Sequence, residues 1–201
     1  MKKVLNLYSG LGGNRRLWSG DIEVTAIEYD PKIAAVYKDL YPNDTVIVAD
    51  AHQYLLDHYQ EFDIIWSSPP CQSHSSFRKN ICCKFRGTKP VYPDMRLYQE
   101  ILLLDNYFSG KWVVENVKPY YESLIEPRVF MNRHMFWSNC EIENISLPKA
   151  KLREAQVPQL QAYHDIDLSK YDLKGLNKRQ LLRNMVDKEL GKVVFDDLMK
   201  A

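Results

Sequence analysis

The chain has 201 residues, of which 45% are hydrophobic and 26% are charged. This length can bury one sizeable core but leaves little room for a second folded unit, and we expect one domain over residues 1–201. No long apolar run or cleavable leader occurs, which argues against membrane, secreted and disordered proteins. The formal net charge of +1 gives no whole-molecule attraction to a polyanion, and so any nucleic-acid interaction must come from local sites. The four cysteines have neither zinc-site spacing nor disulfide density, which predicts a cytoplasmic protein.

Short β-branched, aliphatic and aromatic runs alternate with helix-like stretches over the first two thirds of the chain. The predicted strands are residues 4–7, 24–27, 46–49, 64–66 and 112–114. A helix capped by Asp30 is predicted over residues 31–40, and a second helix with one apolar stripe over residues 94–108. Such alternation is typical of a mostly parallel α/β sheet flanked by helices.

The last third of the chain is less regular. A further strand is predicted within residues 130–137. Residues 141–171 lose clear periodicity and contain two prolines, which predicts a mostly irregular surface segment. From Lys178 onward, apolar residues recur at helical spacing and predict at least one C-terminal helix, although Gly191 leaves its continuity open.

The first three predicted strands end in residues suited to a nucleotide-like ligand. The first leads into YSGLGGN at residues 8–14, where glycines let backbone amides approach a polar ligand, or form only a tight connection. Glu28 and Tyr29 end the second strand and could bind ribose hydroxyls and an adenine face, or be a surface acid beside a packing aromatic. Asp50 ends the third and could accept from an adenine amino group, or merely cap the next helix. Together these three strand ends favour an adenosine-type cofactor.

The next two strand ends carry side chains suited to covalent chemistry. Cys71 follows two prolines and is placed like a nucleophile, although a single cysteine is more often a small buried hydrophobe. His74 need not face Cys71, and we expect it to be a solvated loop residue. Glu115 ends the fifth strand, where it could donate a proton in the same pocket, or be a surface or capping residue.

In this order the segments resemble the DNA (cytosine-5)-methyltransferases. The matching segments are Tyr8 to Gly13, Glu28-Tyr29, Asp50, Pro70-Cys71-Gln72, Glu115-Asn116-Val117, the strand entrance at Arg133, and Gln180 to Val186. The resemblance implies a Rossmann-like methyltransferase sheet, with S-adenosylmethionine as methyl donor and S-adenosylhomocysteine as product. The cofactor residues that it implies are Tyr8, Ser9, Gly10, Gly12, Gly13, Glu28, Tyr29, Asp50, Ala51, Pro70, Asn184 and Val186.

The resemblance also implies a mechanism with three catalytic residues. The Cys71 thiolate would add to C6 of cytosine, which makes C5 nucleophilic toward the methyl group, and loss of the C5 proton would then release the enzyme. Glu115 would hold N3 and the amino group of the ring, and Arg133 would pair with O2. A duplex substrate would need base flipping, which costs roughly a few kcal/mol that DNA contacts must offset.

The loop after Cys71 mixes cations with aromatic residues, as phosphate contact and base stacking require, although a solvated loop can have the same composition. The residues expected to contact nucleic acid are Gln72, Ser75, Arg78, Lys79, Arg86 and Asn116.

The chain departs from the family pattern in two places. Residues 140–178 are too short for a separate target-recognition domain and predict a short irregular insertion. In it Lys149, Lys151 and Arg153 could touch phosphate. Arg133-His134 replaces the usual doubled arginine, which leaves the base contact open between these two residues.

The leading interpretation is a compact DNA cytosine C5-methyltransferase of the phage or mobile-element type. An RNA cytosine C5-methyltransferase is the nearest alternative, since the catalytic residues do not distinguish the sugar. A catalytically silent nucleic-acid-binding relative is the second alternative. The expected partner is DNA, with an auxiliary recognition protein or a cognate restriction enzyme to supply target choice, and no membrane.

Overall fold

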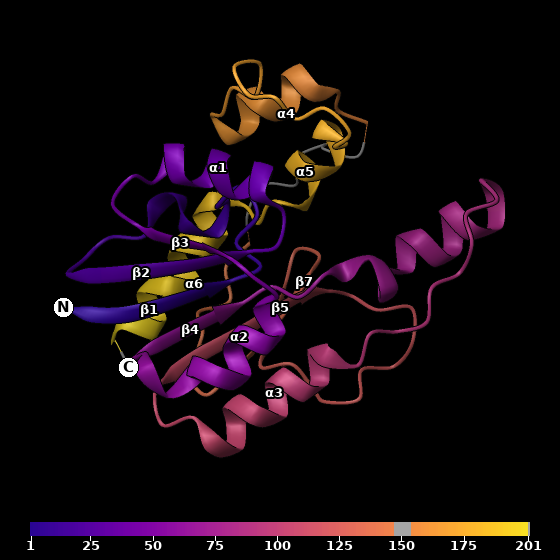
Figure 1. The fold of residues 1–201 in the computed structure, drawn as a ribbon. Helices are drawn as coiled ribbons and strands as arrows, with labels where there is room; N and C mark the ends of the chain where they lie inside the picture. The colour runs from indigo at the N-terminus through magenta and orange to yellow at the C-terminus, as the bar shows by residue number, and fades with distance from the viewer. Residues whose placement is uncertain (147–153, 201) are drawn as a thin grey trace.

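The computed structural model describes residues 1–146 and 154–200, which form a seven-stranded sheet with helices on both faces (Figure 1). The strands are β1 (Lys2–Leu7), β2 (Ile22–Glu28), β3 (Thr45–Val48), β4 (Ile64–Ser67), β5 (Lys111–Val117), β6 (Val129–Met131) and β7 (His134–Ser138). Their order across the sheet is β3-β2-β1-β4-β5-β7-β6, and β7 runs antiparallel to both of its neighbours. Strands β1 to β5 pair with one another in parallel. The predicted Rossmann-like sheet and its five parallel strands are confirmed.

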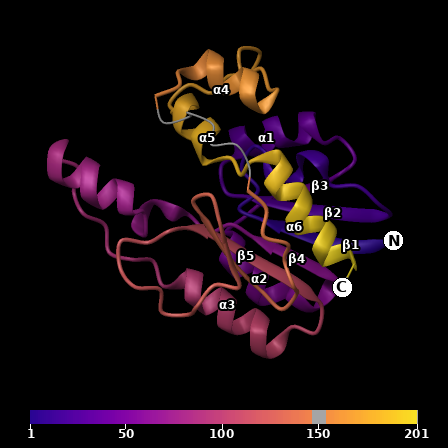
Figure 2. The ribbon, with the colours of Figure 1, turned by 180° about the vertical axis from the view of Figure 1, so that it is seen from behind.

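Helices cover both faces of the sheet because neighbouring strand residues point in opposite directions. Val4 packs with Val194 of α6 in one core cluster, and Leu5 packs with Leu55 of α2 in the other. The first face carries the 3-10 helix η1 (Asn14–Leu17), α1 (Pro31–Leu40) and α6 (Lys188–Lys200), which crosses the view in Figure 2. The second face carries α2 (Ala51–His58) and α3 (Arg96–Tyr107). The remaining helical segments are η2 (Tyr59–Glu61), η3 (Cys71–Ser73), η4 (Arg78–Cys83), α4 (Val157–His164) and α5 (Lys178–Asn184).

The predicted helices form with small changes of boundary. Asp30 caps α1 by accepting from the backbone N–H groups of Lys32 and Ile33, and α3 falls within residues 94–108. The C-terminal segment forms two helices, α5 and α6. Gly191 lies inside α6, where an added Cβ would stand 2.5 Å from the backbone oxygen of Asn14, and so the glycine permits close packing of α6 on η1.

The segment predicted as one strand within residues 130–137 forms a hairpin instead. β6 and β7 pair antiparallel, and the turn between them begins at Asn132, whose φ is +55°. Asparagine tolerates this left-handed conformation better than most residues, which is why the chain can reverse here.

The insertion at residues 140–178 was predicted to be irregular, and this is wrong for residues 157–164, which form α4. Pro158 stands in the first turn of α4 behind a capping box at Gln156, a position where proline starts a helix rather than breaking it. Leu160 and Leu168 are fully buried and pack with Leu11 and other residues of a third core cluster. Residues 160–173 of the insertion therefore contribute to the core. Lys149, Lys151 and Arg153, predicted to touch phosphate, lie outside the described residues.

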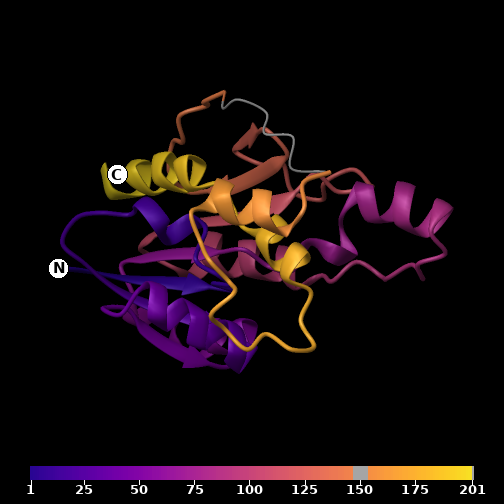
Figure 3. The same cartoon turned by 90° about the horizontal axis from the view of Figure 1, so that it is seen from above.

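The chain after Cys71 leaves the body of the molecule. Residues 76–85 form one helix that includes η4, and Figures 1 and 3 show it projecting beyond the sheet, with residues 86–93 returning alongside. We call residues 76–93 the arm. In the described part of the chain, no helix is both long and apolar enough to span a membrane.

Candidate active site

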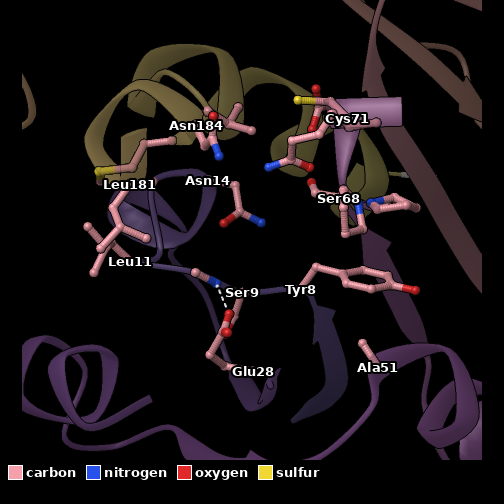
Figure 4. A pocket seen from close by; sticks show the side chains of 18 of the residues that line it. Tyr8, Ser9, Leu11, Asn14, Glu28, Ala51, Ser68, Cys71, Leu181 and Asn184 are labelled. Atoms are coloured by element: carbon pink, nitrogen blue, oxygen red, sulfur yellow. Dashed lines mark hydrogen bonds between the residues drawn. The ribbon is translucent and has the colours of Figure 1, made fainter. Parts of the chain in front are cut away.

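A cavity of about 520 Å³ lies at the carboxyl ends of the parallel strands, and Figure 4 shows side chains from the turn after β1, the end of β2 and the turn after β4 around it. Its size is within the range of about 300–1,000 Å³ that is usual for ligand pockets. Eleven predicted cofactor residues line it: Tyr8, Ser9, Gly10, Gly13, Glu28, Tyr29, Asp50, Ala51, Pro70, Asn184 and Val186. Cys71, Glu115, Arg133 and Gln72 line it as well. The topology therefore brings the predicted cofactor and catalytic residues to one cavity.

The glycine turn after β1 is tied to the end of β2 by Glu28. One carboxylate oxygen accepts from the Gly10 N–H at 2.9 Å, and the other accepts from the Asp30 N–H at 2.9 Å. Burial raises the pKa of Glu28, whereas these backbone hydrogen bonds oppose the rise. Gly10 has a φ of +53°, a conformation that glycine adopts at little cost. Glu28 thus shapes the turn and still presents carboxylate lone pairs to the cavity.

Gly12 and Gly13 have different roles in the turn. An added Cβ at Gly12 would stand 2.3 Å from the Tyr41 ring, and Gly12 is not among the residues that line the cavity. At Gly13 the added Cβ would stand 2.5 Å from the Val186 backbone oxygen. The absent side chain at Gly13 therefore lets the C-terminal segment, with Asn184, reach the cavity.

The cavity fits an adenosine-type group by its unpaired polar atoms and its apolar walls. The Ser9 hydroxyl is buried and has no hydrogen-bond partner within the described structure, although buried polar groups normally find one. Leu11 and Ile33 supply apolar surface beside it, and Tyr29, which is 76% exposed, stands at the rim. A ligand with hydroxyls and an aromatic ring matches this lining.

Asp50 caps α2, which is the structural alternative that the sequence left open. It accepts from the Gln53 N–H at 3.0 Å and pairs with Arg96 at 3.2 Å. The backbone hydrogen bond from Gln53, above all, lowers the pKa of Asp50. Because Asp50 also lines the cavity, its predicted contact with the cofactor stays a prediction.

Sequence reasoning missed Glu100, a fully buried carboxylate beneath the cavity wall. It accepts from the Tyr8 and Ser67 hydroxyls at 2.6 Å each, and its Oε1 lies 2.9 Å from His52 Nδ1. Tyr8 has a φ of +55°, uncommon outside glycine, and burial raises its pKa far above the ordinary value. Glu100 therefore holds a strained residue of the cavity lining in place. An acid in the apolar stripe of the helix at 94–108 was the available sequence signal.

Cys71 lies in η3, directly after the two prolines that end the β4 turn. Burial raises the pKa of its thiol to about 11, the Glu115 carboxylate adds to the rise, and the Arg133 guanidinium opposes it. The thiol is therefore protonated at neutral pH and must lose its proton before it can act as a nucleophile.

Glu115 on β5 and His134 on β7 form a buried pair next to Cys71 in the cavity wall. Glu115 Oε1 and His134 Nδ1 are 2.5 Å apart. Arg133 Nε donates to His134 Nε2 at 3.2 Å, and Arg133 Nη2 donates to the Arg183 backbone oxygen at 2.8 Å. Of the two residues that the sequence left open, His134 contacts the acid directly, whereas Arg133 contacts His134 and α5.

The other predicted substrate residues lie at the base of the arm or beyond the cavity. Asn116 is buried and does not line the cavity; its amide donates to the Pro69 carbonyl at 3.0 Å and supports the turn before Cys71. The Ser75 hydroxyl accepts from the Arg78 N–H, and Lys79 lies 3.9 Å from the Tyr120 ring centroid. Arg86 is exposed on the arm. Their contacts with nucleic acid stay predictions.

His74 was predicted to be a solvated loop residue, and this is wrong. It is 1% exposed, its Nδ1 lies 2.5 Å from the Tyr121 hydroxyl, and its ring packs against Tyr98. His74 is a packing residue and does not line the cavity. Among the described residues no group of three His, Cys, Asp or Glu side chains could hold a metal ion.

The family model of the C-5 cytosine-specific DNA methylases matches residues 2–118, more than half of the chain. The chain belongs to this family of methyltransferases, whose cofactor is S-adenosylmethionine. The predicted family, fold and cofactor are thereby confirmed. No curated protein gives a significant match.

Three solved structures illustrate what the chain is similar to. A DNMT2 mutant from Spodoptera frugiperda is 26% identical, with a TM-score of 0.43 over 62% of this chain and 38% of that one. SMU.776 complexed with SAH is 19% identical, with a TM-score of 0.39 over 57% and 31%. A SAM-dependent methyltransferase from Agrobacterium tumefaciens is 16% identical, with a TM-score of 0.44 over 60% and 40%. The chain thus spans less than half the length of each.

Proposed function

We propose that the protein transfers a methyl group to C5 of cytosine in DNA through a covalent bond between Cys71 and C6. The observation that carries the proposal is the common cavity: the thiol, the Glu115 carboxylate and eleven of the twelve predicted cofactor residues line it. A base must enter this cavity to reach Cys71, and a base in a duplex must therefore leave the stack.

The reaction begins with a proton that Cys71 must lose, because its thiol is protonated at neutral pH. As sulfur bonds to C6, the π electrons of the C5–C6 bond shift toward C5 and N3. N3 gains one proton, which balances the proton that sulfur lost. Glu115, the acid beside Cys71, carries this proton from sulfur to N3. Bound S-adenosylmethionine supplies an electrophilic methyl group to the nucleophilic C5.

Release of the product reverses the addition. The C5 proton leaves to water, the C5–C6 double bond re-forms, and sulfur departs from C6. N3 returns its proton to sulfur through Glu115. Over the cycle one methyl group replaces one proton, and Cys71 and Glu115 regain their starting states.

The arm supplies the nucleic-acid contacts in this proposal. Lys84 and Arg86 offer positive charge, and Phe85 and Tyr92 are 77% and 87% exposed. Cations and aromatic rings together suit phosphate contact and base stacking. Target choice would come from a partner, either an auxiliary recognition protein or a cognate restriction enzyme, since Leu160 and Leu168 of the insertion are buried in the core.

The test is transfer of a labelled methyl group to unmethylated duplex DNA and to RNA, followed by nucleoside analysis. We expect 5-methylcytosine in DNA with the wild-type protein and with Cys82→Ala, a matched change in the arm, but not with Cys71→Ala. DNA that carries 5-fluorocytosine should form a stable adduct, because fluorine cannot leave C5 as a proton does. Product in RNA alone would replace DNA by RNA as the substrate, and product with Cys71→Ala would refute the covalent step.

A further inference from the structure

His134 is a buried polar residue to which the proposed chemistry gives no role. It is 6% exposed on β7 and lines the cavity. Nδ1 of its ring faces the Glu115 carboxylate at 2.5 Å, and Nε2 faces the Arg133 Nε at 3.2 Å. The imidazole therefore lies between an anion and a cation that both line the same cavity.

These two contacts determine where the ring proton lies. A guanidinium nitrogen can only donate, and so His134 Nε2 must offer a lone pair to Arg133. The proton is then on Nδ1, which donates it to Glu115 Oε1. Glu115 is the acceptor in this contact, and its second oxygen, Oε2, has no hydrogen bond within the described structure.

We infer that His134 is the positioning residue of Glu115: as a neutral ring protonated on Nδ1, it holds Oε1 and leaves Oε2 to accept from the amino group of the target base. The inference rests on the proposed cytosine chemistry. Cytosine presents an amino donor where thymine and uracil present a carbonyl oxygen. Oε2 accepts from this amino group, whereas a carbonyl oxygen would meet Oε2 without a proton between them, and the site therefore favours cytosine.

The first experiment compares kcat/KM for DNA methylation at pH 8 by wild type, His134→Asn and His134→Leu. Asparagine keeps an N–H near the place of Nδ1, whereas leucine offers no donor. We expect His134→Asn to stay within about tenfold of wild type and His134→Leu to lose about 10- to 100-fold. His58→Asn, at an exposed histidine on α2, should keep the wild-type rate. An equal loss in His134→Asn and His134→Leu, or no loss in His134→Leu, would overturn the inference.

The second experiment does not depend on activity. Imidazole ¹⁵N NMR of the full chain at pH 8 should show His134 as the Nδ1–H tautomer. An Nε2–H tautomer would overturn the inference whether or not the protein is active. If the wild type methylates no cytosine yet shows the Nδ1–H tautomer, the proposed function fails while the described proton position stands.

Discussion

The raised pKa of Cys71 leads to a counter-intuitive prediction, in which removal of the neighbouring acid makes the thiol more reactive. Burial and the Glu115 charge together place the pKa at about 11. At pH 8 such a thiol is about 0.1% ionised, against about 10% for a thiol of pKa 9.0, and only the thiolate is alkylated. Iodoacetamide should therefore modify Cys71 about 100-fold more slowly than an ordinary cysteine at this pH.

Glu115→Gln removes the charge and keeps the shape of the side chain. Its carbonyl can still accept from His134 Nδ1, and so the main change near Cys71 is electrostatic. We expect the Cys71 pKa to fall and the alkylation rate at pH 8 to rise about tenfold, equivalent to about 1.4 kcal/mol. Methyl transfer should fall in the same variant, because the amide cannot carry the proton to N3.

The assay is alkylation over pH 7–11, read peptide by peptide by mass spectrometry. Cys82 and Cys83 serve as internal controls, since they lie in the arm and should react at the same rates with and without Glu115→Gln. Arg133→Gln should slow Cys71, because that guanidinium lowers its pKa. Half-maximal reactivity of Cys71 near pH 9, or a slower reaction in Glu115→Gln, would refute the electrostatic reasoning.

Three further predictions concern stability and cofactor binding. Gly13→Ala should lower the free energy of unfolding by about 1–3 kcal/mol, because its Cβ would stand 2.5 Å from the Val186 oxygen. It should also weaken S-adenosylmethionine binding, measured by calorimetry, and an unchanged affinity would count against the contact. Glu100→Ala should cost about 1–3 kcal/mol in denaturant unfolding, since three side-chain partners lose their buried acceptor. Burial lowers the pKa of His164 below 6.5, and folding therefore favours its neutral form. The free energy of unfolding should fall as the pH drops below about 6.5. The difference in Tm between pH 7.5 and pH 5.5 should be smaller for His164→Leu than for wild type, and unchanged for His58→Asn.

The sheet could be predicted from the sequence because its strands are short apolar runs between helices of clear period. Neighbouring residues such as Ile64 and Ile65 are both buried, on opposite faces, and continuous hydrophobicity is typical of a strand covered on both sides. The hairpin at β6 and β7 was harder to predict, since one turn at Asn132 separates two short runs. α4 was missed because Pro158 indicates a break equally well as a helix start.

The site could be predicted as far as strand topology determines it. Parallel strands end at one edge, and so Glu28, Cys71 and Glu115 had to lie near one another. Contacts between side chains of distant segments carry no such local pattern. His74 is buried because Tyr98 and Tyr121 pack on it, and nothing within its own segment indicates those neighbours.

The insertion and the cofactor site are physically coupled through Leu11. This residue lines the cavity and also packs in the same core cluster as Leu160 and Leu168 of the insertion. A recognition domain that folds by itself can be exchanged without disturbing catalysis, but removal of this segment would expose Leu11 and the glycine turn beside it. The insertion and the cavity therefore share one core in this chain, and a change at Leu160 or Leu168 should alter S-adenosylmethionine affinity.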